Sequence, residues 1–215
     1  MNVVVVAPHP DDETLGCGGA IRLHADSGDR VTVVFLTSGE LGLSRLDRAE
    51  AQKVREAEAQ EAAAVLGIDR IEFLHLLDWE LDTQLEEAAD SLCGPLERLR
   101  PDLVYAPHEG EWHPDHRVAL GLTRTALRRA GLTPELRSYE FWTPLSPVGL
   151  VMDITAVMPA KVAAVRCYRS QLEQTDYERA VVGLNQYRGI LDQHHVEYAE
   201  AFRWEALEPG TEPGR

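Results

Sequence analysis

The chain has 215 residues, of which 44% are hydrophobic, so a single domain can bury a sizeable core. Its 36 acidic residues outnumber its 21 basic residues and give a net charge of −15, which argues against binding to nucleic acid or to an anionic membrane surface. We therefore expect a small-molecule partner, or another copy of the chain in a homo-oligomer.

The sequence carries no pattern typical of export or membrane insertion. It opens on a short apolar run without a charged segment before it, and no apolar run approaches the length of a membrane-spanning helix. The three cysteines, Cys17, Cys93 and Cys167, lie far apart and form no CxxC pair. Free thiols in a cytoplasmic protein are the expectation.

Strands and helices are predicted to alternate four times before residue 131. Short runs rich in valine and leucine indicate buried strands, and longer runs rich in alanine, glutamate and arginine indicate helices. The pattern predicts strands over residues 3–7, 31–36, 70–74 and 103–106, each followed by a helix, over residues 14–27, 47–66, 85–99 and 114–130. This alternation is typical of an α/β fold with a mostly parallel central sheet and helices on both faces.

The second half of the chain is less regular. It predicts strands over residues 137–142, 148–154 and 197–204, and helices over residues 159–169 and 177–192. Residues 205–215 are acidic and interrupted by proline and glycine, so we expect a mobile tail there. No repeat or linker divides the preceding part, and residues 1–204 are expected to form a single domain.

A polar cluster follows the first predicted strand. His9 and Asp12 offer one nitrogen and one oxygen ligand three residues apart, while Asp11 between them is left to move a proton. The crowded carboxylates need a positive counter-charge, and a metal ion supplies one. In an open parallel sheet, ligands bind beyond the carboxyl ends of the strands, where this cluster lies: Pro8-His9-Pro10-Asp11-Asp12-Glu13.

A second polar cluster follows the fourth predicted strand. Pro114 suits the first turn of a helix, so His113 lies near the N-cap and shares one helical face with His116. In the doubly wound strand order 3-2-1-4, the first and fourth strands are neighbours. The two clusters are therefore expected to meet in one site.

The combined clusters contain the ligands of a catalytic metal. His9, Asp12 and His116 form a set of two nitrogens and one oxygen that suits zinc with an open position for water. Iron(II) or cobalt(II) fits these ligands nearly as well.

The neighbouring polar residues suggest the remaining catalytic roles. We expect Asp11 to take the proton of the attacking water as general base. A protonated His113 is expected to stabilise the oxyanion and to pass a proton to the leaving amine, with Asp115 holding His113 in the required tautomer and keeping it cationic. The predicted reaction class is metal-assisted amide hydrolysis.

The two clusters resemble the signatures of the PIG-L/LmbE family of N-acetylglucosaminyl deacetylases, A-H-P-D-D-E after the first strand and H-P-D-H after a later one. The resemblance implies a Rossmann-like fold and removal of N-acetyl groups from glucosaminyl conjugates, with the metal at His9, Asp12 and His116 and the base at Asp11. It spans most of residues 2–204 and also includes Gly16-Cys17-Gly18-Gly19, Thr37-Ser38-Gly39-Glu40, Arg55-Glu56, Tyr168-Arg169-Ser170-Gln171 and Tyr198-Ala199-Glu200-Ala201-Phe202.

The resemblance also implies substrate-binding residues. In members that act on thiol-cofactor precursors, an arginine in the second helix and an aspartate after the third strand bind sugar hydroxyls, and Arg55 and Asp78 match these places. Members of the mycothiol branch resemble one another in a tyrosine where this chain has Glu111, which is our third candidate for substrate binding. This departure weakens a mycothiol assignment and leaves the substrate open. Family members often form trimers or hexamers.

Three alternative functions stay open. An amidase for a mycothiol- or bacillithiol-type conjugate, or for another acylated amine, would use the same residues. A metal- or sugar-binding module without turnover would have no need of Asp11. A nucleotide-binding protein would use the glycines of residues 16–19, but these lack the G-x-G-x-x-G spacing, and close helix packing explains them better.

Overall fold

The computed structural model describes residues 1–191 and 195–207 of the chain. Its strands are β1 (Asn2–Ala7), β2 (Arg30–Phe35), β3 (Arg70–Phe73), β4 (Leu103–Pro107), β5 (Glu135–Tyr139), β6 (Leu150–Asp153) and β7 (Ala199–Trp204). Its α-helices are α1 (Asp12–Asp26), α2 (Arg48–Leu66), α3 (Leu85–Leu99), α4 (Pro114–Arg129), α5 (Met158–Val165), α6 (Arg169–Leu172) and α7 (Tyr177–Leu191).

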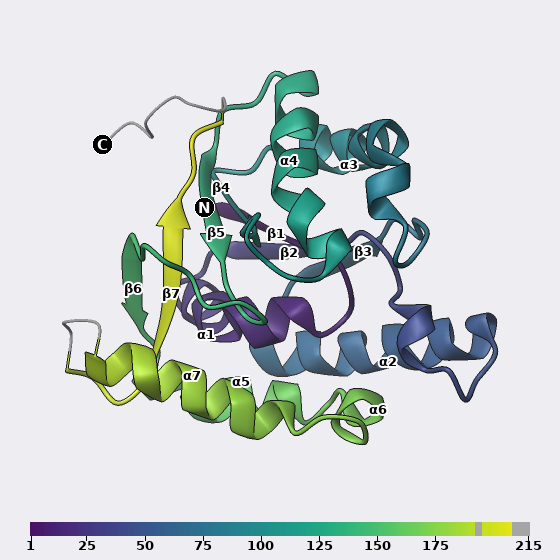
Figure 1. Cartoon of the computed structure of the whole chain (residues 1–215). Helices are drawn as coiled ribbons and strands as arrows, with labels where there is room; N and C mark the ends of the chain where they lie inside the picture. Colours follow the sequence, from purple (N-terminus) through teal and green to yellow (C-terminus); the bar gives the residue numbers. More distant parts are fainter. Residues whose placement is uncertain (192–194, 208–215) are drawn as a thin grey trace.

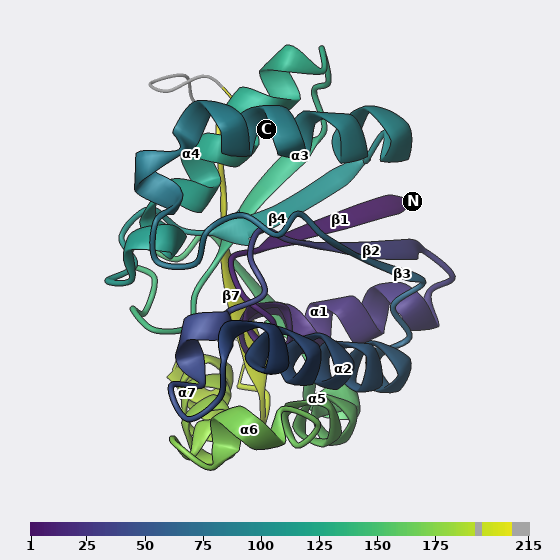
Figure 2. The same ribbon diagram turned by 90° about the vertical axis from the view of Figure 1, so that its right-hand side faces the viewer.

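The elements form three layers around one sheet (Figure 1). Figure 2 shows α3 and α4 on one face of the sheet and α1, α2, α5, α6 and α7 on the other. The strand order is β3-β2-β1-β4-β5-β7-β6, with β1 to β5 parallel and β7 antiparallel to both of its neighbours. This arrangement confirms the predicted α/β, Rossmann-like three-layer fold and the predicted order 3-2-1-4.

The central strand β1 explains why its sequence is apolar at every position. Val3 and Val5 pack into the core shared with α1, α2 and α5, whereas Val4 and Val6 pack into the core beneath α3 and α4. Side chains alternate between the two faces of a strand, so a strand covered on both faces must be apolar throughout. The same strand pairs with β2 and β4, which places the end of β1 beside the end of β4.

The glycines of α1 allow this helix to approach the sheet closely. A Cβ atom at Gly16 would lie 2.4 Å from the ring of Tyr139, and one at Gly19 would lie 2.5 Å from Ile154. No side chain fits at such distances, so close packing is the role of these glycines, as the sequence favoured over nucleotide binding.

A buried ion pair between Lys161 and Glu200 lies beside α1. The carboxylate of Glu200 in β7 accepts hydrogen bonds from the backbone amides of Gly19 (2.7 Å) and Ala20 (2.8 Å). It also accepts one from Lys161 Nζ of α5 at 2.6 Å. Both side chains are fully buried, so each charge depends on the other and on the helix amides.

Boundaries in the second half differ from the prediction. β5 ends at Tyr139 instead of residue 142, and the helix predicted over residues 159–169 ends at Val165, with α6 beginning separately at Arg169. β5 ends early because Phe141 donates its backbone N–H to the buried Glu111 carboxylate, which replaces a strand partner. That carboxylate is a tertiary contact, invisible to a local pattern.

The end of the described chain is anchored at Glu205, where the predicted tail begins. Its carboxylate accepts hydrogen bonds from Ser138 Oγ (2.7 Å) and from Arg124 Nη2 (2.7 Å). Residues 208–215, most of the predicted mobile tail, lie outside the described residues, so both the mobility and the domain limit stay predictions. Within the described ranges no helix combines the length and hydropathy needed to cross a membrane.

Candidate metal centre and active site

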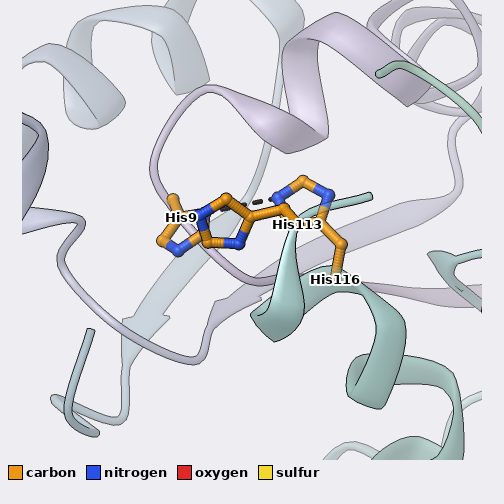
Figure 3. Close-up of side chains that lie close together, drawn as sticks. All are labelled: His9, His113 and His116. Atoms are coloured by element: carbon orange, nitrogen blue, oxygen red, sulfur yellow. Dashed lines mark hydrogen bonds between the residues drawn. The ribbon is translucent and has the colours of Figure 1, made fainter. Parts of the chain in front are cut away.

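The two polar clusters meet at the carboxyl ends of β1 and β4. His9 lies in the turn between β1 and α1, and His113 and His116 lie on the first turn of α4. Pro114 occupies the first helical position, and His113 caps the helix by accepting a hydrogen bond from the backbone N–H of Asp115. Figure 3 shows the three imidazole rings close together, with His113 and His116 at the start of one helix.

Three candidate ligand atoms form a nearly equilateral triangle. The distances are 3.2 Å between His9 Nδ1 and Asp12 Oδ2, 3.1 Å between His116 Nε2 and Asp12 Oδ2, and 3.3 Å between His116 Nε2 and His9 Nδ1. Ligands bound tetrahedrally to zinc at about 2.0–2.1 Å lie about 3.3 Å from each other. The spacing of these atoms therefore fits one small cation capping the triangle.

Two further groupings contain ligand atoms within 4.8 Å of one another, His9 with His113 and His116, and His9 with Asp78 and Asp115. In the second grouping, Asp78 and Asp115 each lie 3.1 Å from Nε2 of His9, the ring nitrogen opposite the triangle. A histidine that binds a metal through one nitrogen characteristically donates the other N–H to a carboxylate. These two aspartates thus have the place of partners that orient His9.

The electrostatic balance of the triangle favours positive charge. Burial alone would lower the pKa of His9, but hydrogen bonds to Asp115, Asp12 and Asp78 outweigh it and hold that pKa well above the ordinary value. Burial would raise the pKa of Asp12, yet the charge and hydrogen bond of His116, followed by those of His9, hold it far below the ordinary value. The centre therefore stabilises a cation next to an ionised carboxylate.

Asp11 lies beside the triangle in a strained backbone conformation. Its φ of 124° and ψ of −32° are rare for a residue with a side chain, so the surrounding contacts must hold it there. Its Oδ2 lies 3.3 Å from Nη2 of Arg55, and its side chain lines a pocket. Burial raises the pKa of Asp11 to about 8, although the charge of Arg55 opposes that rise.

Glu13 holds the backbone of Asp11, a role that the sequence did not indicate. Its carboxylate accepts hydrogen bonds from the N–H of Asp11 at 3.1 Å, from Oη of Tyr168 at 2.5 Å, and from the hydroxyl of Thr14. Burial raises the pKa of Glu13, while the bonds from Thr14 and Tyr168 limit the rise. Both Glu13 and Tyr168 belong to segments that carry the family resemblance, but sequence alone gives no sign of their contact.

The predicted partnership of His113 and Asp115 needs correction. The carboxylate of Asp115 accepts hydrogen bonds from the backbone amides of Trp79 (2.9 Å) and Leu81 (3.1 Å), and it lies 3.1 Å from Nε2 of His9. It therefore orients His9 rather than His113. Asp115 is the second residue of α4, and its side chain contacts His9 in the turn after β1 and the loop after β3, while His113 caps the helix end.

The surroundings of His113 favour its neutral form over the expected cationic form. Burial, followed by the nearby imidazoles of His9 and His116, lowers the pKa of His113 to about 4. Its Nδ1 accepts the hydrogen bond from the backbone N–H of Asp115 at 3.3 Å, so the proton of the neutral ring lies on Nε2. The ring is thus a hydrogen-bond donor rather than a positive charge.

The three candidate substrate residues fall into two groups. Arg55 and Asp78 line the pocket beside Asp11. Both are partly engaged by the chain: Arg55 donates to the carbonyl oxygens of Pro10 and Gly39, and Asp78 accepts from the N–H of Leu41 at 2.8 Å. The Nε atom of Arg55 is buried with no hydrogen-bond partner in the described part of the chain.

Glu111 does not line the pocket. It is buried, and its two carboxylate oxygens accept hydrogen bonds from the backbone amides of Phe141 and Thr143, both at 3.0 Å. Burial raises the pKa of Glu111, against the opposing bond from Phe141. We correct the predicted substrate contact accordingly, because these bonds make Glu111 the tie between two loops.

The pocket has a polar floor and an aromatic mouth. It spans about 630 Å³, counting the part open to solvent. Its mouth includes Trp79 and Trp112, which are about half exposed. The lining residues are His9, Asp11, Asp12, Gly39, Gly42, Arg55, Asp78, Trp79, Trp112, His113, His116, Trp142, Gln171, Gln174 and Tyr177.

Known proteins resemble this chain along nearly its whole length. It is 32% identical to diacetylchitobiose deacetylase from Thermococcus kodakarensis, over 94% of this chain and 82% of that protein. It is similar to the solved structure of N,N'-diacetylchitobiose deacetylase from Pyrococcus horikoshii, with 28% identity and a TM-score of 0.83, over 95% of this chain and 84% of that one. It is also 27% identical to 4-oxalmesaconate hydratase from Pseudomonas putida, over 94% of this chain and 88% of that protein.

A match to a family model assigns the chain to a protein family. Residues 4–127, which include both polar clusters and the helices and strands between them, match the model described as GlcNAc-PI de-N-acetylase. The match and the 32% identity to a deacetylase over most of the chain agree with the three-layer fold and with the resemblance of the two motifs. The chain belongs to the PIG-L family.

Proposed function

We propose that this protein hydrolyses the N-acetyl amide of an N-acetylglucosamine-type conjugate, with a divalent cation, most simply zinc, held by His9, Asp12 and His116. The observation that carries the proposal is the triangle of candidate ligand atoms, 3.1–3.3 Å on each side. Beside it lies the buried carboxyl group of Asp11, which is not part of the triangle and lines an open pocket. The deacetylase names of the relatives supply the substrate class. A cation held there would polarise the amide carbonyl and make water a stronger nucleophile at neutral pH.

Asp11 acts as the general base in this proposal. Its backbone is held by Glu13, so its carboxylate is fixed at the edge of the triangle rather than turned to solvent. A buried carboxyl group is a stronger base than an exposed one, and the guanidinium of Arg55 at 3.3 Å favours its ionised form. Asp11 takes one proton from the attacking water and returns it to the nitrogen of the leaving amine.

His113 stabilises the developing negative charge on the carbonyl oxygen. As a neutral imidazole with its proton on Nε2, it donates a hydrogen bond without adding a second positive charge next to the cation. Asp115 accepts the hydrogen bond of His9 Nε2, and Oδ1 of Asp78 lies 3.1 Å from the same nitrogen, which leaves Nδ1 of His9 facing the triangle. The three polar residues of the H-P-D-H motif thus have separate roles: His113 donates to the carbonyl oxygen, Asp115 orients His9, and His116 holds the cation.

Metal-assisted hydration of a carbon–carbon double bond is the second candidate, because one relative is named as a hydratase. Both reactions use an activated water, so the centre alone does not separate them. Three relatives named as deacetylases favour the amide reaction.

The deciding experiment incubates the zinc-loaded protein with N-acetylglucosamine, N,N'-diacetylchitobiose, an N-acetylglucosaminyl conjugate with an anionic aglycone, an acylated thiol conjugate and 4-oxalmesaconate. Released acetate and free amine are measured for the three amino sugars, free amine alone for the amide of the thiol conjugate, and loss of the conjugated double bond for 4-oxalmesaconate. We expect acetate and amine in equal amounts from at least one amino sugar, abolished by a chelator and restored by zinc. Hydration of 4-oxalmesaconate without acetate release would overturn the proposal.

A further inference from the structure

The ring of His113 is held by one long hydrogen bond in the described part of the chain. Its Nδ1 accepts from the backbone N–H of Asp115 at 3.3 Å, at the weak end of the range for such bonds. The torsion that turns an imidazole about its Cβ–Cγ bond has broad minima, so a single bond of this length does not fix the ring. The direction in which Nε2 donates must therefore depend on the groups packed against His113.

The indole of Trp79 is the aromatic ring nearest to His113 among the described residues. Their ring centroids lie 4.2 Å apart, with an interplanar angle of 59°. The rings of His9, His116 and Trp112 lie farther away, at 4.8, 5.1 and 5.5 Å. The spacing to Trp79 is shorter than the roughly 4.5–7 Å usual for pairs of aromatic rings, so the indole blocks rotation of the imidazole on that side.

The backbone of Trp79 is itself clamped to the first turn of α4. Its φ of 65° is an uncommon conformation for a bulky residue, so other contacts must impose it. The backbone N–H of Trp79 donates to Oδ2 of Asp115 at 2.9 Å, and that of Leu81 donates to Oδ1 at 3.1 Å. The side chain of Leu81 is buried in the core beneath α3 and α4. The indole thus projects from a short segment that is fixed at two points.

Asp115 joins both members of this aromatic pair to the candidate metal centre. Its backbone N–H donates to His113, and its carboxylate accepts from the backbone N–H of Trp79. The same Oδ2 lies 3.1 Å from Nε2 of His9. The relative positions of Trp79, His113 and His9 are therefore set by one buried residue.

We propose that Trp79 is a positioning residue for the reaction: its indole packs against the ring of His113 and fixes the direction in which Nε2 donates to the carbonyl oxygen. This inference rests on the proposed function for the role of His113 and adds the residue that keeps His113 in place. Asp115 then influences His113 through the indole of Trp79, in addition to orienting His9. Trp79 acts through His113 and needs no contact with the substrate.

A double-mutant cycle tests this role in the full-length zinc-loaded protein, with acetate release from N,N'-diacetylchitobiose as the assay. Trp79→Ala should lower kcat about tenfold with KM nearly unchanged, because a misdirected donor is lost mainly in the transition state. Trp79→Phe should keep most of the rate, since a ring still packs against His113. In a His113→Ala background, Trp79→Ala should change kcat by less than about twofold, because the group that it positions is absent.

Trp204→Ala is the matched control for the loss of a tryptophan. Trp204 is half exposed like Trp79, lies in β7 and is not part of the pocket lining, so kcat should stay unchanged. Zinc content is measured in every variant and should equal that of the unchanged protein.

Crystal structures of the unchanged protein and of Trp79→Ala give a readout that does not depend on turnover. We expect one orientation of the His113 ring in the unchanged protein and a different or mixed orientation in Trp79→Ala. An unchanged ring, a loss of zinc, a higher KM with unchanged kcat, or an equal loss of kcat with and without His113 would overturn the positioning role. A displaced ring in a protein that turns over no amino sugar would support the positioning of His113 and overturn the proposed reaction.

Discussion

At the scale of single residues, Asp11 owes its chemistry to its neighbours. Its strained backbone is held by Glu13, its carboxylate is paired with Arg55 at 3.3 Å, and burial raises its pKa to about 8. A carboxyl group in such a setting is suited to exchanging protons near neutral pH, whereas Asp12 next to it is held ionised by two imidazoles. Adjacent residues thus have opposite protonation tendencies.

The role of Asp11 is testable by an isosteric change. Asp11→Asn keeps the shape of the side chain but removes the base, so kcat for acetate release should fall on the order of 10³-fold. Elemental analysis should find the same zinc content as in the unchanged protein, because the ligand triangle does not include Asp11. Full activity in this variant would show that the base is assigned to the wrong residue.

The hydroxyl of Tyr168 should matter to the rate through Glu13 rather than through substrate. Tyr168→Phe removes the 2.5 Å hydrogen bond to Glu13 and loosens the backbone of Asp11, so we expect kcat to fall by about tenfold with KM nearly unchanged. Tyr187→Phe, at an exposed position of α7, is the matched control. A rise in KM without a fall in kcat would contradict this positioning role.

At this scale the sequence predicted where the site residues lie better than it predicted their hydrogen-bond partners. The positions of His9, Asp12 and His116 at two strand ends followed from motif spacing and strand order, because both are local or topological properties. The partners of Asp115 and Glu111 did not follow, since each carboxylate bonds to backbone groups of a distant loop. The contact of Glu13 with Tyr168 did not follow either, since it joins residues 155 positions apart. A carboxylate near a catalytic motif can equally well serve a ligand, a substrate or a loop.

At the scale of elements, the position of α1 depends on the buried pair of Lys161 and Glu200. Helix α1 carries Asp12 at its first residue, and Glu200 holds the middle of that helix through the amides of Gly19 and Ala20. Since Lys161 neutralises this carboxylate inside the core, the pair links α1, α5 and β7 into one unit behind the site.

Breaking this pair should destabilise the protein strongly. Lys161→Met leaves the Glu200 carboxylate buried without its cation, and we expect the free energy of unfolding in urea to fall by about 3 kcal/mol. Arg166→Met breaks the exposed pair between Arg166 and Glu178 and should cost less than about 1 kcal/mol. Similar losses in the two variants would show that the buried pair is not a principal contact of the fold.

Elements were predictable where their patterns are local. The alternating strands and helices up to α4 have clear apolar runs, and α2 ends at Leu66, where the predicted helix ends, with Gly67 at φ 78° as its C-cap. The region after β5 was less predictable because its boundaries depend on tertiary contacts: the Glu111 carboxylate ends the strand, and α6 is held by the bonds of Glu58 to the backbone and hydroxyl of Ser170.

At the scale of the whole molecule, the fold brings into one pocket residues from the ends of β1 and β4 and from the loops that follow β2, β3 and β5. The strand order places β1 inside the sheet, between β2 and β4, so the turn after β1 lies among these loops. A doubly wound sheet forms its ligand crevice at such a point. The catalytic proposal therefore depends on the two motifs sharing one cation there.

Anomalous X-ray diffraction at the zinc edge, on crystals of the zinc-loaded protein, tests that claim most directly. We predict one ion at about 2.0–2.2 Å from Nδ1 of His9, Oδ2 of Asp12 and Nε2 of His116, with no protein atom as a fourth ligand. An ion bound instead between Asp78, Asp115 and Nε2 of His9, or no bound ion at this position, would contradict the account.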